Sequence, residues 1–524
     1  MQHLRGQVQI RGGPIGIGAA ASASVYGGGV GYGRGNTLPL SRAVARWEAG
    51  LRSHPDREFV AWLLRGLKTG FRIGFDYEAH TCRAARKSMR SAKEQADVVT
   101  NYLQDERAQQ RVIDPPFSGR TAHLSPFGVI PKPRQPGKWR LILDLFSPHG
   151  HSVNDGIDPH LCSLSYARVD DAAMRILALG RGTLLAKMDI QSAYRLIPVH
   201  PDDRHLLGMC WRGSVNLDAA LPFGLRSAPK IFSAVADALL WVMFRRGVSS
   251  AIHYLDDFLF CGAAGSGKCA HNLASALSTC RDLGVPVAEH KTQGPSTVLT
   301  FLGIEIDTVH MQLRLPSEKL ARLQDVLLSW STRRGGTKRE LLSLIGSLHH
   351  ACAVIKPGRS FLRRLIELSK VPKTLHHFVR LNKEARADIS WWAAFASRWN
   401  GIGLLSALGK VRPIVCLESD ALDGWGCGAV WQHRWLQLKW GHGYRAFGHS
   451  GKRNCPVVLV AVCWGLSWTS KHVLFRVDNS TVVSALFSGS CRDQQVMRLI
   501  RLLQFVAAEL QFTFTAEHLP AQRT

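Results

Sequence analysis

The chain has 524 residues, of which 46% are hydrophobic. This is enough apolar material to bury several cores, which excludes a disordered protein and predicts about three or four domains. Lys and Arg number 66 against 39 Asp and Glu, a formal charge of +27, and so large a positive excess indicates a polyanionic partner, most often nucleic acid.

The cysteines and the apolar stretches indicate in which compartment the protein is expected to work. The twelve cysteines are scattered singly, without zinc-finger or C-x-x-C spacing, so we expect neither structural zinc nor a disulfide framework. The longest apolar stretch, around residues 456–468, is shorter than the roughly 20 residues that cross a bilayer, and no secretory leader opens the chain. We therefore expect an intracellular protein of the cytoplasm or nucleus, with reduced thiols and no membrane segment.

The first part of the chain predicts a tail and a helical segment. The first 36 residues contain eleven glycines, and such a composition cannot bury enough apolar surface to order itself, so residues 1–37 are predicted to be flexible. Residues 38–114 show helical spacing of apolar residues and end in a basic run, which predicts a basic helical lead-in. The apolar positions are Phe59, Trp62, Leu63 and Leu67.

The remainder predicts two domains with both helices and strands. Residues 115–310 alternate β-rich runs with helical ones, which indicates an α+β domain. Residues 311–410 predict helices, one beginning near Pro316 and one opening with a capping box. Residues 411–524 show a second strand-rich pattern with an apolar helix from Pro456, which predicts an α/β domain. Strands are expected at residues 128–133, 139–145, 184–190, 251–260 and 301–307, a helix at 228–244, and the capping box at Thr337 and Glu340.

Three aspartates form a candidate metal site. The segment HYLDDFLF, residues 253–260, sets Asp256 and Asp257 side by side in an apolar hairpin, where unpaired charge is costly. Asp189 ends an apolar strand, and a strand end and a hairpin turn can converge. Such aspartates can hold two Mg²⁺ ions, with Mn²⁺ as an alternative, about 3.5–4 Å apart for in-line phosphoryl transfer. A role in turns and caps would explain one of them but not two within an apolar hairpin.

These motifs resemble those of a known family. In order, KMDIQSAY, LPFGLRSAPKIF, YLDDFL and FLGIEI resemble the palm motifs of reverse transcriptases, and VIPKPRQPGKWRLILDL resembles their fingers. RGLKTGFRIGFD, VNDGI, NCPVVLVAVCWG and LFRVDNS look most like DIRS-type retrotransposon polyproteins, from about residue 50 to the end.

The resemblance implies a fold and an activity. The fold class is α+β, a right-hand polymerase with fingers and palm at residues 115–310 and thumb and connection helices at 311–410. A ribonuclease H-like α/β domain, truncated at its C-terminus, follows at 411–524. The implied activity is RNA-directed DNA polymerisation, in which dNTPs are added to a primer on an RNA or DNA template.

The resemblance also assigns roles to the aspartates and to one tyrosine. Asp189 and Asp256 would bind the metals, and Asp257 would be the less critical third member. Tyr194 takes the place of the residue that lies under the incoming sugar, so a 2′-hydroxyl would clash and dNTPs would be preferred. A buried Tyr194 could also be an ordinary core residue, but its spacing from Asp189 fits the steric role.

Other positions match the nucleotide-binding parts of the family. Lys132 and Arg140 would bind the triphosphate, and Arg can do so with two parallel hydrogen bonds. Phe223 and Gly224 lie in the turn that binds template and dNTP, with Phe where retroviral enzymes often have Gln. Lys291 would protonate the leaving pyrophosphate. Taken singly, the three cations would be ordinary surface charges, and only their place in the ordered motifs favours function.

The last domain departs from its family pattern. LESDALDGWGCGAVW and LFRVDNSTVV resemble acidic strands of ribonuclease H, and Asp420 and Asp478 match aspartates that hold Mg²⁺ there. The expected helical Glu falls at Arg453, and the last acidic ligand would follow Thr524, where the chain stops. We therefore expect impaired cleavage of RNA paired with DNA.

Two other interpretations remain open. A catalytically inactive retroelement remnant that only binds nucleic acid is favoured by Arg453, by the end of the chain and by the missing recombinase of DIRS-type elements, whereas the intact aspartates favour the enzyme. A telomerase-like enzyme is a weaker alternative, because such chains lack an attached ribonuclease H-like domain.

Overall fold

The chain divides into two compact units, each of which is described separately below. The first comprises Met1–Ala167, Ala186–Gly262 and Ser266–Pro295, and the second Arg168–Leu185, Ala263–Gly265 and Ser296–Thr524. The computed structural model describes residues 38–81, 88–115, 122–131, 137–398, 400–403, 415–422, 424–441, 449–469, 471–489, 491, 493–510 and 512–519. The predicted tail at residues 1–37 lies outside the described residues.

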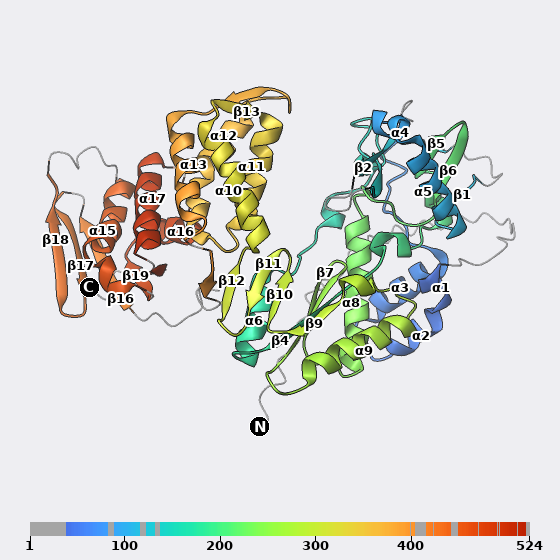
Figure 1. Cartoon of the computed structure of the whole chain (residues 1–524), viewed down its shortest axis with the longest axis horizontal. Helices are drawn as coiled ribbons and strands as arrows, with labels where there is room; N and C mark the ends of the chain where they lie inside the picture. The colour runs from blue at the N-terminus through green and yellow to red at the C-terminus, as the bar shows by residue number, and fades with distance from the viewer. Residues whose placement is uncertain are drawn as a thin grey trace. The chain divides into compact units, whose positions relative to one another are not determined.

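The first unit combines helices with three small sheets (Figure 1). The sheets have the strand orders β1-β6-β5, β2-β3 and β7-β8-β4-β9. The helices are α1 (Pro39–Arg42), α2 (Val44–Gly50), α3 (Arg57–Thr69), α4 (Arg90–Glu94), α5 (Ala96–Ala108), α7 (Pro201–Arg204), α8 (Ala228–Arg245) and α9 (Lys268–Asp282), with the 3-10 turns η1 (Asn154–Gly156), η2 (His160–Cys162), η3 (Ala193–Leu196) and η4 (Glu289–Lys291). The strands are β1 (Val112–Ile113), β2 (Phe127–Pro131), β3 (Trp139–Leu143), β4 (Leu184–Asp189), β5 (Gly208–Trp211), β6 (Ser214–Asp218), β7 (Ala251–Tyr254), β8 (Asp257–Gly262) and β9 (Gln293–Ser296).

The predicted helical lead-in is part of the core of this unit. Helix α3 begins at the cap Asp56, whose side chain accepts a hydrogen bond from Phe59 N at 2.8 Å. Of its predicted apolar positions, Leu63 and Leu67 are fully buried, whereas Phe59 and Trp62 are half-buried. The indole of Trp47 on α2 donates to Leu283 O after α9 at 3.0 Å. Helix α2 therefore packs against the end of α9, within the core of this unit.

A buried ionic network joins α5, η3 and β6. The guanidinium of Arg195 contacts Glu106 Oε2 and Asp218 Oδ1, each at 2.7 Å, and Arg111 contacts Glu106 Oε1 at 2.6 Å. Burial alone would lower the pKa of Arg195, but Asp218 and Glu106 outweigh burial and raise it. Burial raises the pKa of Asp218 to about 6, against the opposing charge of Arg195. Each charge is therefore tolerated only because its partners are present.

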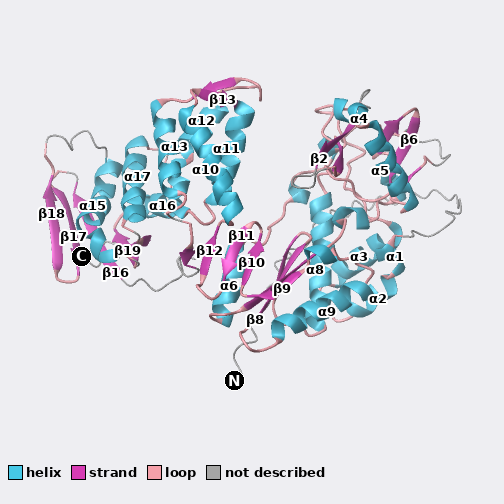
Figure 2. Ribbon diagram, in the orientation of Figure 1, coloured by secondary structure: helices cyan, strands magenta, loops and turns pink. Residues whose placement is uncertain are grey.

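The second unit begins with a small sheet, continues as a helical layer and ends in a five-stranded sheet (Figure 2). Its helices are α6 (Val169–Leu179), α10 (Ser317–Thr332), α11 (Lys338–Ala351), α12 (Arg363–Lys370), α13 (Lys383–Phe395), α15 (His449–Trp464), α16 (Ser480–Ser488) and α17 (Gln494–Glu509), with the 3-10 turns η5 (Lys356–Phe361) and η7 (Gly465–Trp468). Its strands are β10 (Val298–Phe301), β11 (Ile304–Asp307), β12 (Gln312–Arg314), β13 (Gly335–Thr337), β14 (Phe378–Arg380), β15 (Ile402–Gly403), β16 (Val415–Leu422), β17 (Gly426–Trp431), β18 (Arg434–Lys439), β19 (His472–Val477) and β20 (Thr513–His518).

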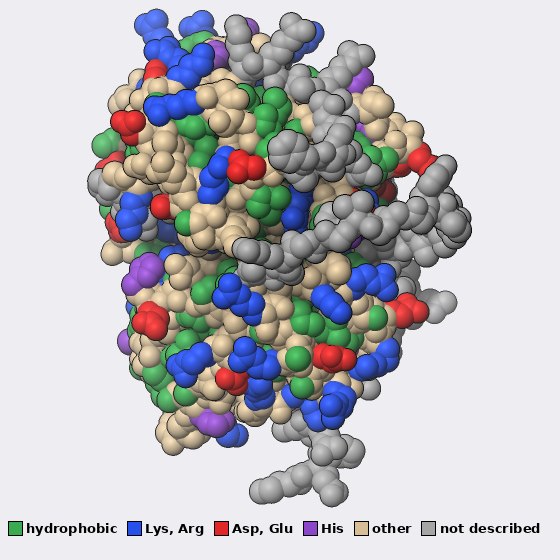
Figure 3. Space-filling model, turned by 90° about the vertical axis from the view of Figure 1, so that its right-hand side faces the viewer, with side chains coloured by type: hydrophobic (Ala, Val, Ile, Leu, Met, Phe, Trp, Pro, Cys, Tyr) green, Lys and Arg blue, Asp and Glu red, His purple; other side chains and the backbone are tan. Residues whose placement is uncertain are grey.

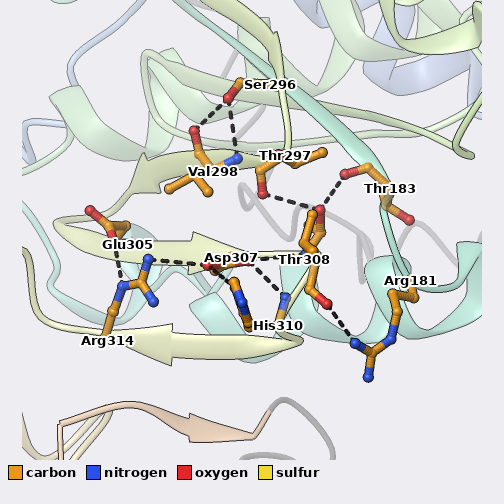
Figure 4. A network of polar contacts seen from close by, with 11 residues as sticks. Arg181, Thr183, Ser296, Thr297, Val298, Glu305, Asp307, Thr308, His310 and Arg314 are labelled. Atoms are coloured by element: carbon orange, nitrogen blue, oxygen red, sulfur yellow. Dashed lines mark hydrogen bonds and ion pairs between the residues drawn. The ribbon is translucent and has the colours of Figure 1, made fainter.

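One expected strand is in fact a hairpin. The prediction of a single strand at residues 301–307 is wrong, because Leu302 and Gly303 have φ values of 50° and 76° and turn the chain between β10 and β11. Polar contacts hold this sheet to the segment before β4 (Figure 4). The hydroxyl of Thr308 lies 2.7 Å from Thr183 O, and Arg181 Nη1 donates to Val309 O at 2.8 Å.

The two helices predicted after Pro316 are present. Helix α10 buries Leu323 and Leu327, as the spacing indicates. Helix α11 begins with the predicted capping box, in which Thr337 Oγ1 accepts from Glu340 N at 3.3 Å and the Glu340 carboxylate accepts from Thr337 N at 2.8 Å.

The closing sheet has the strand order β18-β17-β16-β19-β20, with β16, β19 and β20 parallel and the first three strands antiparallel. One face packs on α15, α16 and α17, and β16 alternates buried and exposed residues accordingly. Helix α15 begins at His449, so the prediction of a helix from Pro456 is wrong, and Pro456 lies inside the helix. Within the described residues, no helix is both long and apolar enough to cross a bilayer.

The ionic network provides a test of the fold. Arg195→Met should lower the free energy of unfolding by about 3–5 kcal/mol, because it leaves Asp218 buried without its cation. Urea unfolding followed by circular dichroism measures this. Arg212→Met is the matched control, since Arg212 is exposed and lies 4.0 Å from Asp97, and it should change stability by less than about 0.5 kcal/mol. Equal effects of the two substitutions would contradict the buried role.

Candidate active site

The strand register brings the three aspartates to one end of a sheet. Asp189 is the last residue of β4, Asp257 is the first of β8, and Asp256 lies in the turn between β7 and β8. Strands β8 and β4 are neighbours, and Ile190 N donates to Asp256 O at 3.0 Å. The hairpin turn is therefore fixed to the end of β4, and the convergence expected from the sequence is what the backbone produces.

The three carboxylates interact unfavourably with one another. Burial raises the pKa of Asp256, and the charge of Asp189 adds to the effect, while Lys291 and Arg140 oppose it. Burial raises the pKa of Asp257 to about 6, and the charges of Asp256 and Asp189 contribute. Lysine side chains only partly compensate, so this end of the sheet carries excess negative charge and favours a cation.

Lys291 is the cation in contact with the site. It lies in η4, and its Nζ is 2.9 Å from Asp189 Oδ1 and 3.0 Å from Oδ2. The backbone fixes the same segment, because Ala288 N donates to Asp189 O at 2.8 Å. Its side chain is 48% exposed, so Lys291 can move away from Asp189 without breaking the core.

The donor chemistry suits a hard divalent ion. Carboxylate oxygens are the ligands that Mg²⁺ and Mn²⁺ prefer. Within the described part of the chain, no three acidic, histidine or cysteine side chains are grouped so that they could hold a metal ion as they stand. The mutual repulsion of Asp256 and Asp257 and the pairing of Asp189 with a movable lysine nevertheless fit a site in which added cations replace Lys291.

An aromatic group lies next to the carboxylates. Tyr194 in η3 packs against Phe223 and Phe232, with ring centroids 5.4 and 5.7 Å apart. Burial raises the pKa of Tyr194 to about 12, and Tyr166 and Asp256 contribute, which places the phenol near the acidic site. Tyr194 directly precedes the buried Arg195, whose contacts with Glu106 and Asp218 anchor its backbone.

The turn that carries Phe223 and Gly224 is built from glycine and a buried asparagine. Gly224 has a φ of 101°, and a Cβ there would lie 2.7 Å from Leu143 O, so no other residue fits without a shift. Asn154, fully buried, donates from Nδ2 to Gly224 O at 2.9 Å and accepts from Arg226 N at 2.8 Å. The VNDGI motif therefore holds the shape of this turn.

Of the two cations predicted to bind the triphosphate, the structure describes only Arg140. Arg140 is exposed on β3, and its guanidinium carbon lies 5.3 Å from the Phe223 ring centroid. Its charge also reaches Asp256, so the structure brings Arg140, Phe223 and the aspartates into one region. Lys132 lies outside the described residues.

A histidine at the same hairpin was not predicted. His253 Nε2 lies 2.9 Å from Asp237 Oδ1 on α8, and its Nδ1 lies 3.2 Å from Leu255 O. Leu255 has a φ of 51° and directly precedes Asp256. His253 thus braces the turn, and no sequence signal marks it, because a histidine two residues before a turn is not distinctive without its partner on α8.

The two aspartates of the closing sheet also lie level with each other. The parallel register pairs Ser419 with Val477, so Asp420 and Asp478 come next on adjacent strands. Asp420 is on the exposed face of β16. Arg453 falls within α15, at residues whose side chains the structure does not describe.

Nearby charges on that face are paired. Glu418 lies 3.5 Å from Arg476, which also contacts Glu517 at 3.0 Å. Glu418 is therefore already engaged as an ion-pair partner on the same strand face as Asp420.

Comparison with known families gives the class of the central segment. Residues 130–306 match the family described as "Reverse transcriptase (RNA-dependent DNA polymerase)". This segment includes the three aspartates of the site, so the part of the chain that carries them is similar to reverse transcriptases.

The curated relatives are much longer proteins. The Transposon Tf2-3 polyprotein of Schizosaccharomyces pombe is 24% identical over 261 residues, which are 49% of this chain and 17% of the relative. The Pro-Pol polyprotein of Simian foamy virus type 1 is 24% identical over 209 residues, 38% of this chain and 17% of the relative. The chain thus spans about a sixth of the length of these relatives.

Solved structures confirm the predicted fold class. The foamy viral protease-reverse transcriptase dRH in complex with double-stranded DNA has a TM-score of 0.52 at 15% identity and covers 95% of this chain and 84% of its own. The foamy viral protease-reverse transcriptase in complex with an RNA/DNA hybrid has a TM-score of 0.51 at 15% identity. The match covers 95% of this chain and 65% of the foamy viral chain. The chain shares the fold of these foamy viral proteins, with mixed helices and strands, and its last part is an α/β domain with a five-stranded sheet.

The carboxylate repulsion provides a test of the site. The pKa of Asp257 in the folded chain lies above its ordinary value, so the folded state binds this proton more tightly, and stability falls as the pH rises through about 6. Asp257→Asn should therefore raise the melting temperature at pH 8 in EDTA, and the gain should vanish below about pH 4, where the carboxyl is protonated in both states.

Differential scanning fluorimetry from pH 4 to 8 measures this effect. Asp105→Asn is the matched control, because Asp105 is exposed on α5, and it should leave the melting temperature unchanged. A lower melting temperature for Asp257→Asn at pH 8 would show that Asp257 stabilises the fold and that the repulsion is not the dominant interaction.

Proposed function

We propose that the chain is the RNA-directed DNA polymerase of a DIRS-type retrotransposon. One observation carries this proposal: Asp189, Asp256 and Asp257 meet at the end of one sheet, inside the segment that matches the reverse transcriptase family. The raised pKa values of Asp256 and Asp257 favour cations at this point. The motifs quoted above for DIRS-type polyproteins support the narrower assignment.

The proposed cofactor is a pair of Mg²⁺ ions, with Mn²⁺ as a substitute. Asp189 and Asp256 would hold them, with Asp257 as a third, weaker participant. Bound Mg²⁺ would activate the primer 3′-hydroxyl and stabilise charge during phosphoryl transfer. The chain itself contributes a rigid carboxylate arrangement, because β4 and the β7–β8 hairpin are joined by backbone hydrogen bonds.

The substrate would be a deoxynucleoside triphosphate. Arg140 and Lys132 would bind the triphosphate oxygens, and Lys291 Nζ, once released from Asp189, would give a proton to the departing pyrophosphate. Tyr194 would exclude the 2′-hydroxyl of a ribonucleotide, which fits its anchored position beside Asp256. Phe223 and Gly224 would form the turn that contacts the nucleotide and the template base.

The partners would be an RNA or DNA template and its primer. The formal charge of +27 supports phosphate contacts, and Lys and Arg side chains are spread over the face seen in Figure 3, with Asp and Glu scattered among them. The foamy viral proteins of similar fold were solved with double-stranded DNA and with an RNA/DNA hybrid. Such contacts are sequence-blind, so base pairing would give specificity.

The domain boundaries follow from this function. Residues 115–310 would form fingers and palm, 311–410 thumb and connection, and 411–524 the ribonuclease H-like domain, preceded by the lead-in at 38–114 and the tail at 1–37. We propose that cleavage by the last domain is impaired, because Arg453 stands where a metal-binding Glu is expected and a cation repels the metal.

Primer extension tests the polymerase. The full chain should incorporate dTTP on poly(rA)/oligo(dT) with Mg²⁺, and Asp256→Asn should reduce the rate by at least about a thousandfold, because the charge that holds the metal is lost. Asp105→Asn, at an exposed position on α5, is the control and should retain most activity. Equal incorporation by wild type and Asp256→Asn, or none by either, would leave only a nucleic-acid-binding remnant.

A ribonuclease H assay tests the last domain. On a labelled RNA/DNA hybrid with Mg²⁺, the chain should cleave at a background rate that Asp420→Asn does not change. Arg453→Glu restores the expected carboxylate and should increase cleavage. Robust cleavage by the wild type that Asp420→Asn abolishes would show that the domain is competent.

A further inference from the structure

A basic two-stranded ribbon lies at the end of the helical layer of the second unit. Strand β13 pairs with β14 in antiparallel register, with Gly335 opposite Arg380 and Thr337 opposite Phe378. Figure 1 shows β13 at the ends of helices α10 to α13 that point away from β10, β11 and β12. The segment at residues 370–377 is attached to it, since Arg339 N donates to Leu375 O at 3.0 Å.

The ribbon and its loop carry cations and no acidic residue. Residues 333–339 contain four Lys or Arg and residues 370–380 contain three, with no Asp or Glu in either stretch. Two of the seven are ion-paired to the neighbouring helices, Arg333 with Glu340 and Lys370 with Glu367. In the part of the chain that the structure describes, no acidic side chain pairs with four exposed members: Arg334, Arg339, Lys373 and Arg380.

Large apolar side chains are exposed between these cations. Phe378 is 58% exposed and Val371 is 80% exposed. Phe378 and Arg380 lie on the same face of β14, because Val379 between them is buried. A solvated charged surface has no need of an exposed aromatic ring, so this combination indicates a contact surface.

The surface is rigid rather than a loose end. Trp330 is buried beneath it, and a Cβ on Gly336 would lie 2.8 Å from its ring. Lys338 Nζ donates to Pro372 O at 2.7 Å, and Lys338 N donates to His377 O at 2.8 Å. Phe378 is therefore presented at a fixed position, which lowers the entropy lost on binding.

We propose that this basic ribbon, residues 333–339 and 370–380, is a binding site for single-stranded nucleic acid. Unpaired cations contact the phosphates, and the exposed ring of Phe378 stacks on an unpaired base. A duplex offers only phosphates to this surface, since its bases are already stacked. The ribbon lies outside the segment that matches the reverse transcriptase family, and its binding does not require polymerase chemistry.

Anisotropy of a labelled single strand tests the site. The full chain carrying Asp256→Asn is first saturated with unlabelled blunt primer–template duplex and then titrated with fluorescein-labelled oligo(dT). Phe378→Ala should weaken binding roughly tenfold, and Phe378→Trp should restore it. Phe487→Ala is the matched control, because Phe487 is 82% exposed on α16, and it should have no effect.

The salt dependence tests the cations. Lys373→Gln with Arg380→Gln should reduce the slope of log Kd against log salt concentration by about 1.4, or about 0.7 for each phosphate contact. The control pair Arg65→Gln with Lys68→Gln, both exposed on α3, should leave the slope unchanged. Ultraviolet crosslinking of 5-iodouracil-labelled oligonucleotide should modify peptides within residues 370–380.

Several outcomes would overturn the proposal. Equal binding by Phe378→Ala and Phe487→Ala, or crosslinks only elsewhere in the chain, would remove the site. The contact would be purely electrostatic if Lys373→Gln with Arg380→Gln weakened the binding of single strands and duplexes equally and Phe378→Ala had no effect. Stronger binding of a polyglutamate peptide than of oligo(dT) would assign the surface to an acidic protein. All these measurements use the chain carrying Asp256→Asn. Their results therefore do not depend on whether the chain is an active polymerase.

Discussion

Repulsion among three carboxylates is the constraint around which the first unit is built. The pairing of β8 with β4 forces Asp189, Asp256 and Asp257 to one end of a sheet. Burial makes the charges of Asp256 and Asp257 more costly than they are in water. Lys291 offsets part of this cost through Asp189. A rigid backbone is needed because side chains that repel one another would otherwise separate.

That rigidity depends on residues far from the motifs. The buried contacts of Arg195 with Glu106 and Asp218 fix the segment directly after Asp189, and Glu106 lies in α5, before the segment that matches the reverse transcriptase family. Helix α5 of the lead-in therefore helps to hold the segment that follows Asp189. An ionic anchor specifies position more strictly than apolar packing, because each buried charge has few acceptable partners.

Buried ionic contacts also join the helices of the second unit. Asp388 on α13 is buried, and its carboxylate lies 3.2 Å from the Arg364 guanidinium and 3.7 Å from that of Arg501. Arg501 also donates a hydrogen bond to Ser360 O. Ser360 Oγ in turn donates to Gly489 O at 2.7 Å. The helical layer is thus attached to the closing sheet by polar contacts, which leaves the basic ribbon at its other end exposed for binding.

The sequence by itself determined the features that depend on local pattern. Alternating and helical spacing predicted α3, α8, α10 and the β7–β8 hairpin, the capping box fixed the start of α11, and the ordered motifs predicted the aspartates. Only the tertiary structure decided the turn at Leu302, the helix start ahead of Pro456, the brace of His253 on Asp237 and the partners of Arg195. The reason is physical: spacing along the chain encodes which face of an element is apolar. Contacts between elements, such as those of Arg195 with Glu106 and Asp218, depend instead on how the elements pack.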